Sequence, residues 1–150
     1  LKKTKSTLLR LLSLFLVLTL ISPVSATETD DPIMPRASYY LDSYNTYICD
    51  MGSGKIQIWF DVMGTGDMDE IGALDIKIYE SKDNETWTWV DTFGYSNYSG
   101  MLGYDDFSHT GHIEYNGTIG RYYKAYVCVW AGKNGAGDTR YFWTSAKKAT

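Results

Sequence analysis

The sequence predicts an all-β domain, and three observations support that prediction. From Tyr39 onward, short runs rich in β-branched and aromatic residues are separated by clusters of Gly, Asn, Asp and Ser. Residues 55–62 alternate strictly, with an apolar side chain at every second position. No window of eleven residues in this region has good helical periodicity.

The first half of the domain contains three of the expected strands. Residues 44–50 form the first strand, and the glycines at 52 and 54 turn the chain into the second, at 55–62. A polar loop is expected at 63–72, with Gly66 and Gly72 supplying unusual backbone angles and Ile71 plugging the core. The third strand follows at 73–80, with Leu74, Ile76 and Ile78 facing inward.

Four more strands are expected in the second half. A polar hairpin leads to the fourth, at 87–93, and a long loop rich in Gly, Tyr, Ser and Asn precedes the fifth. The turn signal Asn116-Gly117 ends the fifth strand, and a Gly-rich hairpin separates the sixth from the seventh. These last three strands cover 108–115, 121–131 and 139–146.

Seven short strands within about 105 residues, with turns every 8 to 12 residues or so, predict an immunoglobulin-like or fibronectin-III-like β-sandwich. The segment Gly120-Arg-Tyr-Tyr123 enters the sixth strand, where such domains carry a tyrosine corner. Tyr123 is the candidate for that role.

The N-terminal segment is typical of a secretory signal peptide. A basic start with three lysines precedes the mostly apolar run 8–21, and Val24-Ser25-Ala26 fits a small-x-small cleavage site. The sequence therefore predicts a signal peptide at 1–26, a flexible leader at 27–37 and one domain at 38–150. The expected product is secreted, with no membrane attachment after cleavage.

Cleavage would leave an acidic chain. The signal segment contains four of the basic side chains and no acid, so ten basic and eighteen acidic side chains remain, a net charge near −8. A nucleic-acid partner is not expected, because such partners require a basic footprint.

Four blocks in order carry a resemblance: residues 65–73, 78–81, 120–125 and 130–140. They resemble a family of small secreted proteins, mostly from gut Gram-positive bacteria, with a signal peptide and one Ig-like domain of unknown function. The resemblance covers nearly all of 39–148. It implies the fold and the extracellular location, and it implies no activity and no catalytic residues.

Catalysis is not expected. His109 and His112 lie three apart on a predicted strand, so they point to opposite faces. Ser108 stands beside His109 and near Asp105 and Asp106, but nothing places a nucleophile against a base with an oxyanion donor. No cofactor is expected either.

The two cysteines, Cys49 and Cys128, are a possible disulfide in a secreted protein, but a free pair is favoured. Strand phase points both thiols outward, from strands that belong to opposite sheets of a fibronectin-like sandwich. A bridge requires Cα atoms within about 7 Å. The disulfide would be possible if the first strand switched sheets to pair with the last strand, as in immunoglobulin-like domains.

The stretch Asp67-Met-Asp-Glu-Ile-Gly72 resembles the start of an EF-hand loop. The positions that need an oxygen ligand and a bidentate Glu are Ile71 and Ile78, and strands rather than helices flank the stretch, so an EF-hand is excluded. A weak calcium site formed by Asp67, Asp69 and Glu70 is the lesser alternative to a polar turn that joins the two sheets.

Aromatic residues are in surplus, with 13 Tyr and 5 Trp. A candidate binding patch lies on the predicted outer face of the last two strands, formed by Tyr122, Tyr126, Trp130, Tyr141 and Trp143. The sequence thus predicts a non-enzymatic module that binds a glycan or a protein. The alternatives are cross-strand aromatic pairs on a passive structural domain, or a weak calcium-binding module.

Overall fold

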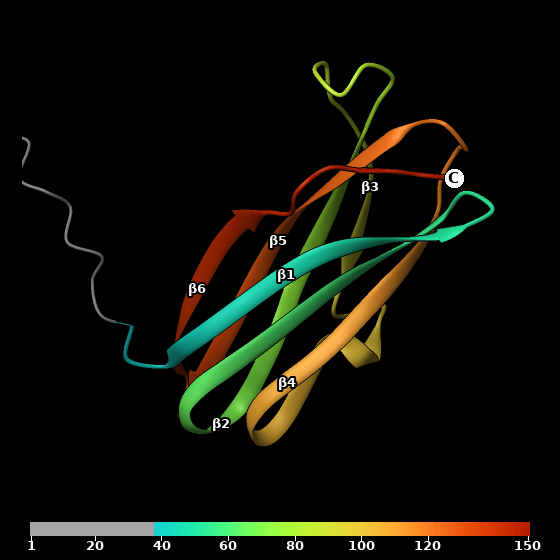
Figure 1. Cartoon of the computed structure of the whole chain (residues 1–150). Helices are drawn as coiled ribbons and strands as arrows, with labels where there is room; N and C mark the ends of the chain where they lie inside the picture. The colour runs from blue at the N-terminus through green and yellow to red at the C-terminus, as the bar shows by residue number, and fades with distance from the viewer. Residues whose placement is uncertain (1–37) are drawn as a thin grey trace, which may run out of the picture. The chain divides into compact units, whose positions relative to one another are not determined.

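Antiparallel strands form one curled sheet, described for residues 38–150 by a computed structural model (Figure 1). A short 3-10 turn, Ser99–Met101, precedes the fourth strand. The seven strands are β1 (Leu41–Gly52), β2 (Lys55–Ser81), β3 (Thr88–Gly94), β4 (Leu102–Asn116), β5 (Tyr122–Lys133), β6 (Ala136–Trp143) and β7 (Lys147–Lys148). The predicted signal peptide at 1–26 and leader at 27–37 lie outside the described residues.

Strand β2 organises the whole sheet because its two halves have different neighbours. The first half, from Lys55 to Gly64, pairs with β1 on one edge and β4 on the other. The second half pairs with β5 on one edge and β3 on the other. In Figure 1, β2 descends beside β1 and β4, bends, and returns behind them beside β5. The sheet thus has one part ordered β1-β2-β4 and another ordered β3-β2-β5-β6.

The prediction of a loop at 63–72 is wrong. The chain stays extended there, so the strands expected at 55–62 and 73–80 are one continuous strand, β2. Met68 and Ile71 anchor this bend, with exposed fractions of 3% and 0%. A shift in register between Met63 and Met68 against β4 accommodates the change of direction. Gly72 has the expected unusual backbone, with φ of 143°, whereas Gly66 is not among the residues with positive φ.

The loop predicted between the strands expected at 87–93 and 108–115 is shorter in the structure, because β4 already begins at Leu102. Its first residues pair with the bend of β2, from Met68 to Gly72, which gives their backbone groups partners. Polar and glycine-rich composition suggested a loop, but pairing across the bend determines the conformation.

The apolar core lies between the two parts of the sheet and agrees with the predicted phase. Ile76 and Ile78 are fully buried, and so is Ile71, the expected plug. Leu74 was expected inside but is only partly buried, because the pairing of β2 with β5 shifts register between Ala73 and Asp75. Aromatic contacts join the two parts, between Tyr115 and Tyr123 at 5.7 Å in the core and between the more exposed Tyr44 and Phe142 at 4.9 Å.

The Tyr123 hydroxyl makes a hydrogen bond with the backbone a few residues upstream, the contact that a tyrosine corner requires. It accepts a hydrogen bond from the backbone N–H of Thr118, five residues upstream, at 2.7 Å. The same hydroxyl donates to Oε2 of Glu80 on β2, at 2.6 Å. The connection between β4 and β5 is thereby fixed to the second half of β2.

No helix within residues 38–150 is long and apolar enough to cross a membrane.

Candidate functional site

An aromatic face covers the outer side of the second part of the sheet. We define it as Tyr79 on β2, Tyr126 on β5, and Tyr141 and Trp143 on β6. Strand register creates it, because Tyr126 pairs with both Lys77 and Trp143, and Cys128 pairs with both Asp75 and Tyr141. Residues directly opposite in antiparallel strands project to the same side. Three of the five predicted patch residues therefore meet here: Tyr126, Tyr141 and Trp143.

The rings of the aromatic face pack against one another. Tyr126 stacks on Tyr141 with centroids 5.7 Å apart, and it is tilted against Trp143 at 4.8 Å. Tyr79 meets Trp143 edge-on at 4.9 Å. Even so, Tyr141 and Trp143 remain 56% and 47% exposed. These rings thus combine a fixed arrangement with a large accessible aromatic area.

One cation lies against this face. The ammonium of Lys124 is 4.4 Å from the ring centroids of both Trp87 and Trp143, a geometry that favours cation–π attraction. The sequence prediction missed Tyr79, Lys124 and Trp87. Alternation places Tyr79 on the outer side of its strand, but only the pairing of β2 with β5 brings it to the patch.

The other two predicted patch residues lie elsewhere. Tyr122 lies at the start of β5, where it pairs with Lys148 of β7, and the Lys148 ammonium is 5.4 Å from the Tyr122 ring. Trp130 lies nearer the β5–β6 turn, where its indole occupies the space above Gly132 and Gly137. A single patch of five residues is therefore not formed.

The cysteines are both free thiols in this structure, on different strands. Cys128 is on the outer side of β5 as predicted, yet it is buried, because Asp75 and Tyr141 flank it across the strands. Burial raises the pKa of the Cys128 thiol, its hydrogen bond with Tyr141 lowers that pKa in part, and Asp75 raises it. A thiol held protonated in this way is a poor nucleophile.

The acidic stretch at the bend of β2 serves as a tie to the β5–β6 turn. The Asp69 carboxylate accepts the backbone N–H of Asn134 at 2.6 Å. The Lys133 ammonium donates to the carbonyl oxygen of Asp67 at 2.7 Å. Among residues 38–150, no group of three His, Cys, Asp or Glu side chains is placed to hold a metal ion. Asp67, Asp69 and Glu70, the candidate calcium ligands, therefore do not form such a group.

The histidines point to opposite sides of β4, as predicted. The ring of His109 lies 5.9 Å from buried Phe60, and its Nε2 is 2.9 Å from the carbonyl oxygen of Gly100. His112 stacks on Trp59 at 4.4 Å, and Trp59 stacks on Tyr47 at 6.1 Å. These three outward rings stand face to face across β1, β2 and β4, a stabilising cross-strand arrangement.

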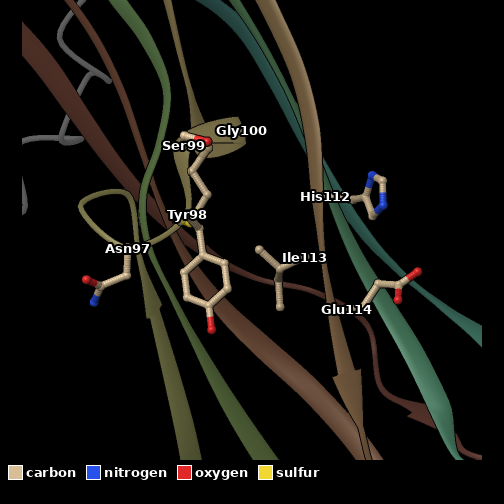
Figure 2. Close-up of a pocket in the computed structure, with 8 residues that line it drawn as sticks. Asn97, Tyr98, Ser99, Gly100, His112, Ile113 and Glu114 are labelled. Carbon is tan, nitrogen blue, oxygen red and sulfur yellow. The ribbon is translucent and has the colours of Figure 1, made fainter.

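A hollow of about 350 Å³ lies between β4 and the segment 97–101 (Figure 2). Figure 2 shows Tyr98 and Ile113 pointing toward one another, whereas His112 and Glu114 point to the other side of the strand. Glu114 is engaged there by Gln57 at 2.8 Å and by Lys55 at 3.2 Å, which lower its pKa. The hollow thus faces the backbone of β4 rather than a set of reactive side chains.

No protein-family model and no curated protein matches this chain.

Proposed function

We propose that this chain is a non-enzymatic binding domain that docks a protein partner through the aromatic face. The observation that supports this most directly is the exposure of Tyr141 and Trp143 on β6, next to Tyr126 and Tyr79. Tyr and Trp are enriched where protein interfaces concentrate their binding energy.

The packing of the rings favours a protein over a sugar as the ligand of this face. Tyr126 and Tyr141 cover one another, and the Lys124 ammonium lies over the ring of Trp143. A sugar stacks on a free ring face, whereas a protein surface makes use of ring edges, hydroxyls and the lysine as well. Glycan docking at the aromatic face is the second candidate.

The immunoglobulin- or fibronectin-III-like assignment supports a binding role and is part of this proposal. It is favoured by the strand orders β1-β2-β4 and β3-β2-β5-β6 and by the contact of Tyr123 with Thr118. An extracellular location follows from the predicted signal peptide at 1–26 and agrees with the family resemblance. Sandwich domains of this kind present outer sheet faces and end loops to partners.

A passive domain is the competing explanation, because cross-strand aromatic pairs also stabilise a sheet. The two explanations differ in what a double substitution does. In a passive domain, replacing Tyr141 and Trp143 affects stability alone. In a binding domain, the same change abolishes docking while the domain remains folded.

The test is a capture experiment with matched variants. Wild type, Tyr141→Ser/Trp143→Ser and the control Tyr47→Ser/Phe107→Ser are immobilised and exposed to culture fluid of the producing cells. The control residues are 42% and 52% exposed and lie on β1 and β4. We expect wild type and control to retain the same protein, and the double variant to lose it. Equal retention by all three, or by none, contradicts the proposal.

A further inference from the structure

A second hollow, of about 310 Å³, lies at the bend of β2, close to the β5–β6 turn. Its lining includes Asp69, Glu70, Tyr104, Trp130, Gly132 and Lys133. We call it the Trp130 hollow. Its volume is at the lower end of the roughly 300–1,000 Å³ typical of small-molecule sites, which suits a ligand of about one ring.

Three lining residues of the Trp130 hollow, Glu70, Tyr104 and Gly132, belong to one row across the sheet, which continues to Gly137 on β6. Glu70 on β2 pairs with Tyr104 on β4 and with Gly132 on β5, and Gly132 pairs with Gly137 on β6. A side chain at either glycine would overlap the six-membered ring of Trp130. The two glycines therefore make the space in which the indole lies.

The space for the Trp130 indole comes at the expense of local strand stability. Glycine within a strand weakens it, and here two glycines are paired. The Nε1 atom of Trp130 is also buried without a hydrogen-bond partner among the described residues. Local costs that gather at one place are typical of functional sites rather than of purely structural ones.

The walls of the Trp130 hollow are held in place before any ligand arrives. The Asp69 carboxylate accepts the Asn134 N–H, and Lys133 donates to the Asp67 carbonyl, so the hairpin tip is tied to the bend of β2. A site that is already ordered loses less conformational entropy on binding.

We propose that the Trp130 hollow binds a neutral pyranose ring, as a free sugar or as the terminal residue of a glycan. Half-buried Trp130 and Tyr104, the latter 59% exposed, both line the hollow and offer apolar ring surface to the C–H groups of a sugar. The Glu70 carboxylate can accept hydrogen bonds from the sugar hydroxyls, and the Lys133 ammonium can donate hydrogen bonds to them. The lining contains the carboxylates of Asp69 and Glu70 beside the ammonium of Lys133, so acceptors and donors both border the hollow, and a neutral ligand with several hydroxyls can use both.

The test titrates the full domain with the methyl pyranosides of glucose, galactose and mannose and with N-acetylglucosamine, followed by saturation-transfer and indole ¹H–¹⁵N NMR. We expect at least one of them to bind with a Kd of roughly 1 mM and to shift the Trp130 indole signal. Trp130→Ala and Tyr104→Ala each weaken this binding at least tenfold, and Trp143→Ala leaves it unchanged. Tyr104→Ala decides the question if Trp130→Ala fails to fold.

Three results would overturn the assignment. One is the absence of saturable binding by every sugar in a folded domain. Another is binding that Trp143→Ala abolishes and Tyr104→Ala leaves intact, which moves the site to the aromatic face. The third is binding of tetramethylammonium in place of the sugars. A glycan array with the same variants then separates a terminal glycan residue from a free sugar. Because Trp143 belongs to the aromatic face alone, sugar binding and protein docking can fail independently.

Discussion

At the scale of single residues, the Tyr123 hydroxyl connects two segments that are far apart in sequence. It accepts from Thr118 and donates to Glu80. We expect Tyr123→Phe to lower the free energy of unfolding by about 1–3 kcal/mol, because the Thr118 N–H and the Glu80 carboxylate both lose a partner while packing is retained. Urea denaturation at neutral pH measures the difference.

Tyr115 provides the control for that substitution. Its ring lies 5.7 Å from that of Tyr123, and burial raises the pKa of both hydroxyls. Tyr115→Phe should change stability by no more than about 0.5 kcal/mol. Equal losses from the two variants would mean that the hydroxyl contacts of Tyr123 contribute nothing specific.

At the scale of elements, the bend of β2 depends on Gly72. Its φ of 143° is unfavourable for any other residue, and an added Cβ would overlap the carbonyl oxygen of Met101. We expect Gly72→Ala to destabilise the domain by about 1–3 kcal/mol from backbone strain alone, with the overlap adding to this. Thermal unfolding followed by circular dichroism measures the effect.

Gly66 is the matched comparison within the same bend. A Cβ there meets nothing within 4 Å. Gly66→Ala should therefore be nearly neutral, within about 0.5 kcal/mol. If Gly66→Ala proved as harmful as Gly72→Ala, the bend would depend on general flexibility rather than on the geometry of Gly72.

At the scale of the whole molecule, two carboxylates hold the ends of the described chain. Asp138 accepts from the Ser38 hydroxyl and from the N–H groups of Tyr39 and Tyr40, and these bonds lower its pKa. Hydrogen bonds from the side chain and backbone of Thr150 lower the pKa of Asp50 in the same way. Folding is thereby linked to the ionised form of both groups.

The pH dependence of stability follows from these lowered pKa values. A carboxyl group whose pKa is lower in the folded state stabilises fully above its unfolded pKa, near 3.9. That stabilisation is lost as the pH falls through the folded pKa. We expect Asp50→Asn/Asp138→Asn to be less stable than wild type at pH 7, and to lose less stability between pH 7 and pH 2. Urea unfolding at both pH values measures this.

The control for the pH experiment is Asp42→Asn, at an exposed position on β1. It should follow wild type across the same range of pH. A double variant as acid-sensitive as wild type would show that the two end contacts are not the source of the acid dependence.

The sequence by itself determined the β class, most strand positions and the buried face of the strongly alternating strands, such as 55–62, because alternation with period two is a local property. Local chemistry also identified Tyr123, whose partner Thr118 lies five residues away. The glycines and acids of 63–72 suggested a loop, because the strands that pair with them, β4 and β5, are distant in sequence.

Only the tertiary structure decided which outward aromatics meet. Register joins Tyr126, Tyr141 and Trp143 to Tyr79 and Lys124, and it separates Tyr122 and Trp130 from them. A strand's own sequence says which residues face outward, but not which neighbour stands opposite, because a register is set by pairing between segments up to about 60 residues apart. For the same physical reason, the sequence did not show that the Asp69 carboxylate and the Asp67 carbonyl bind the β5–β6 hairpin.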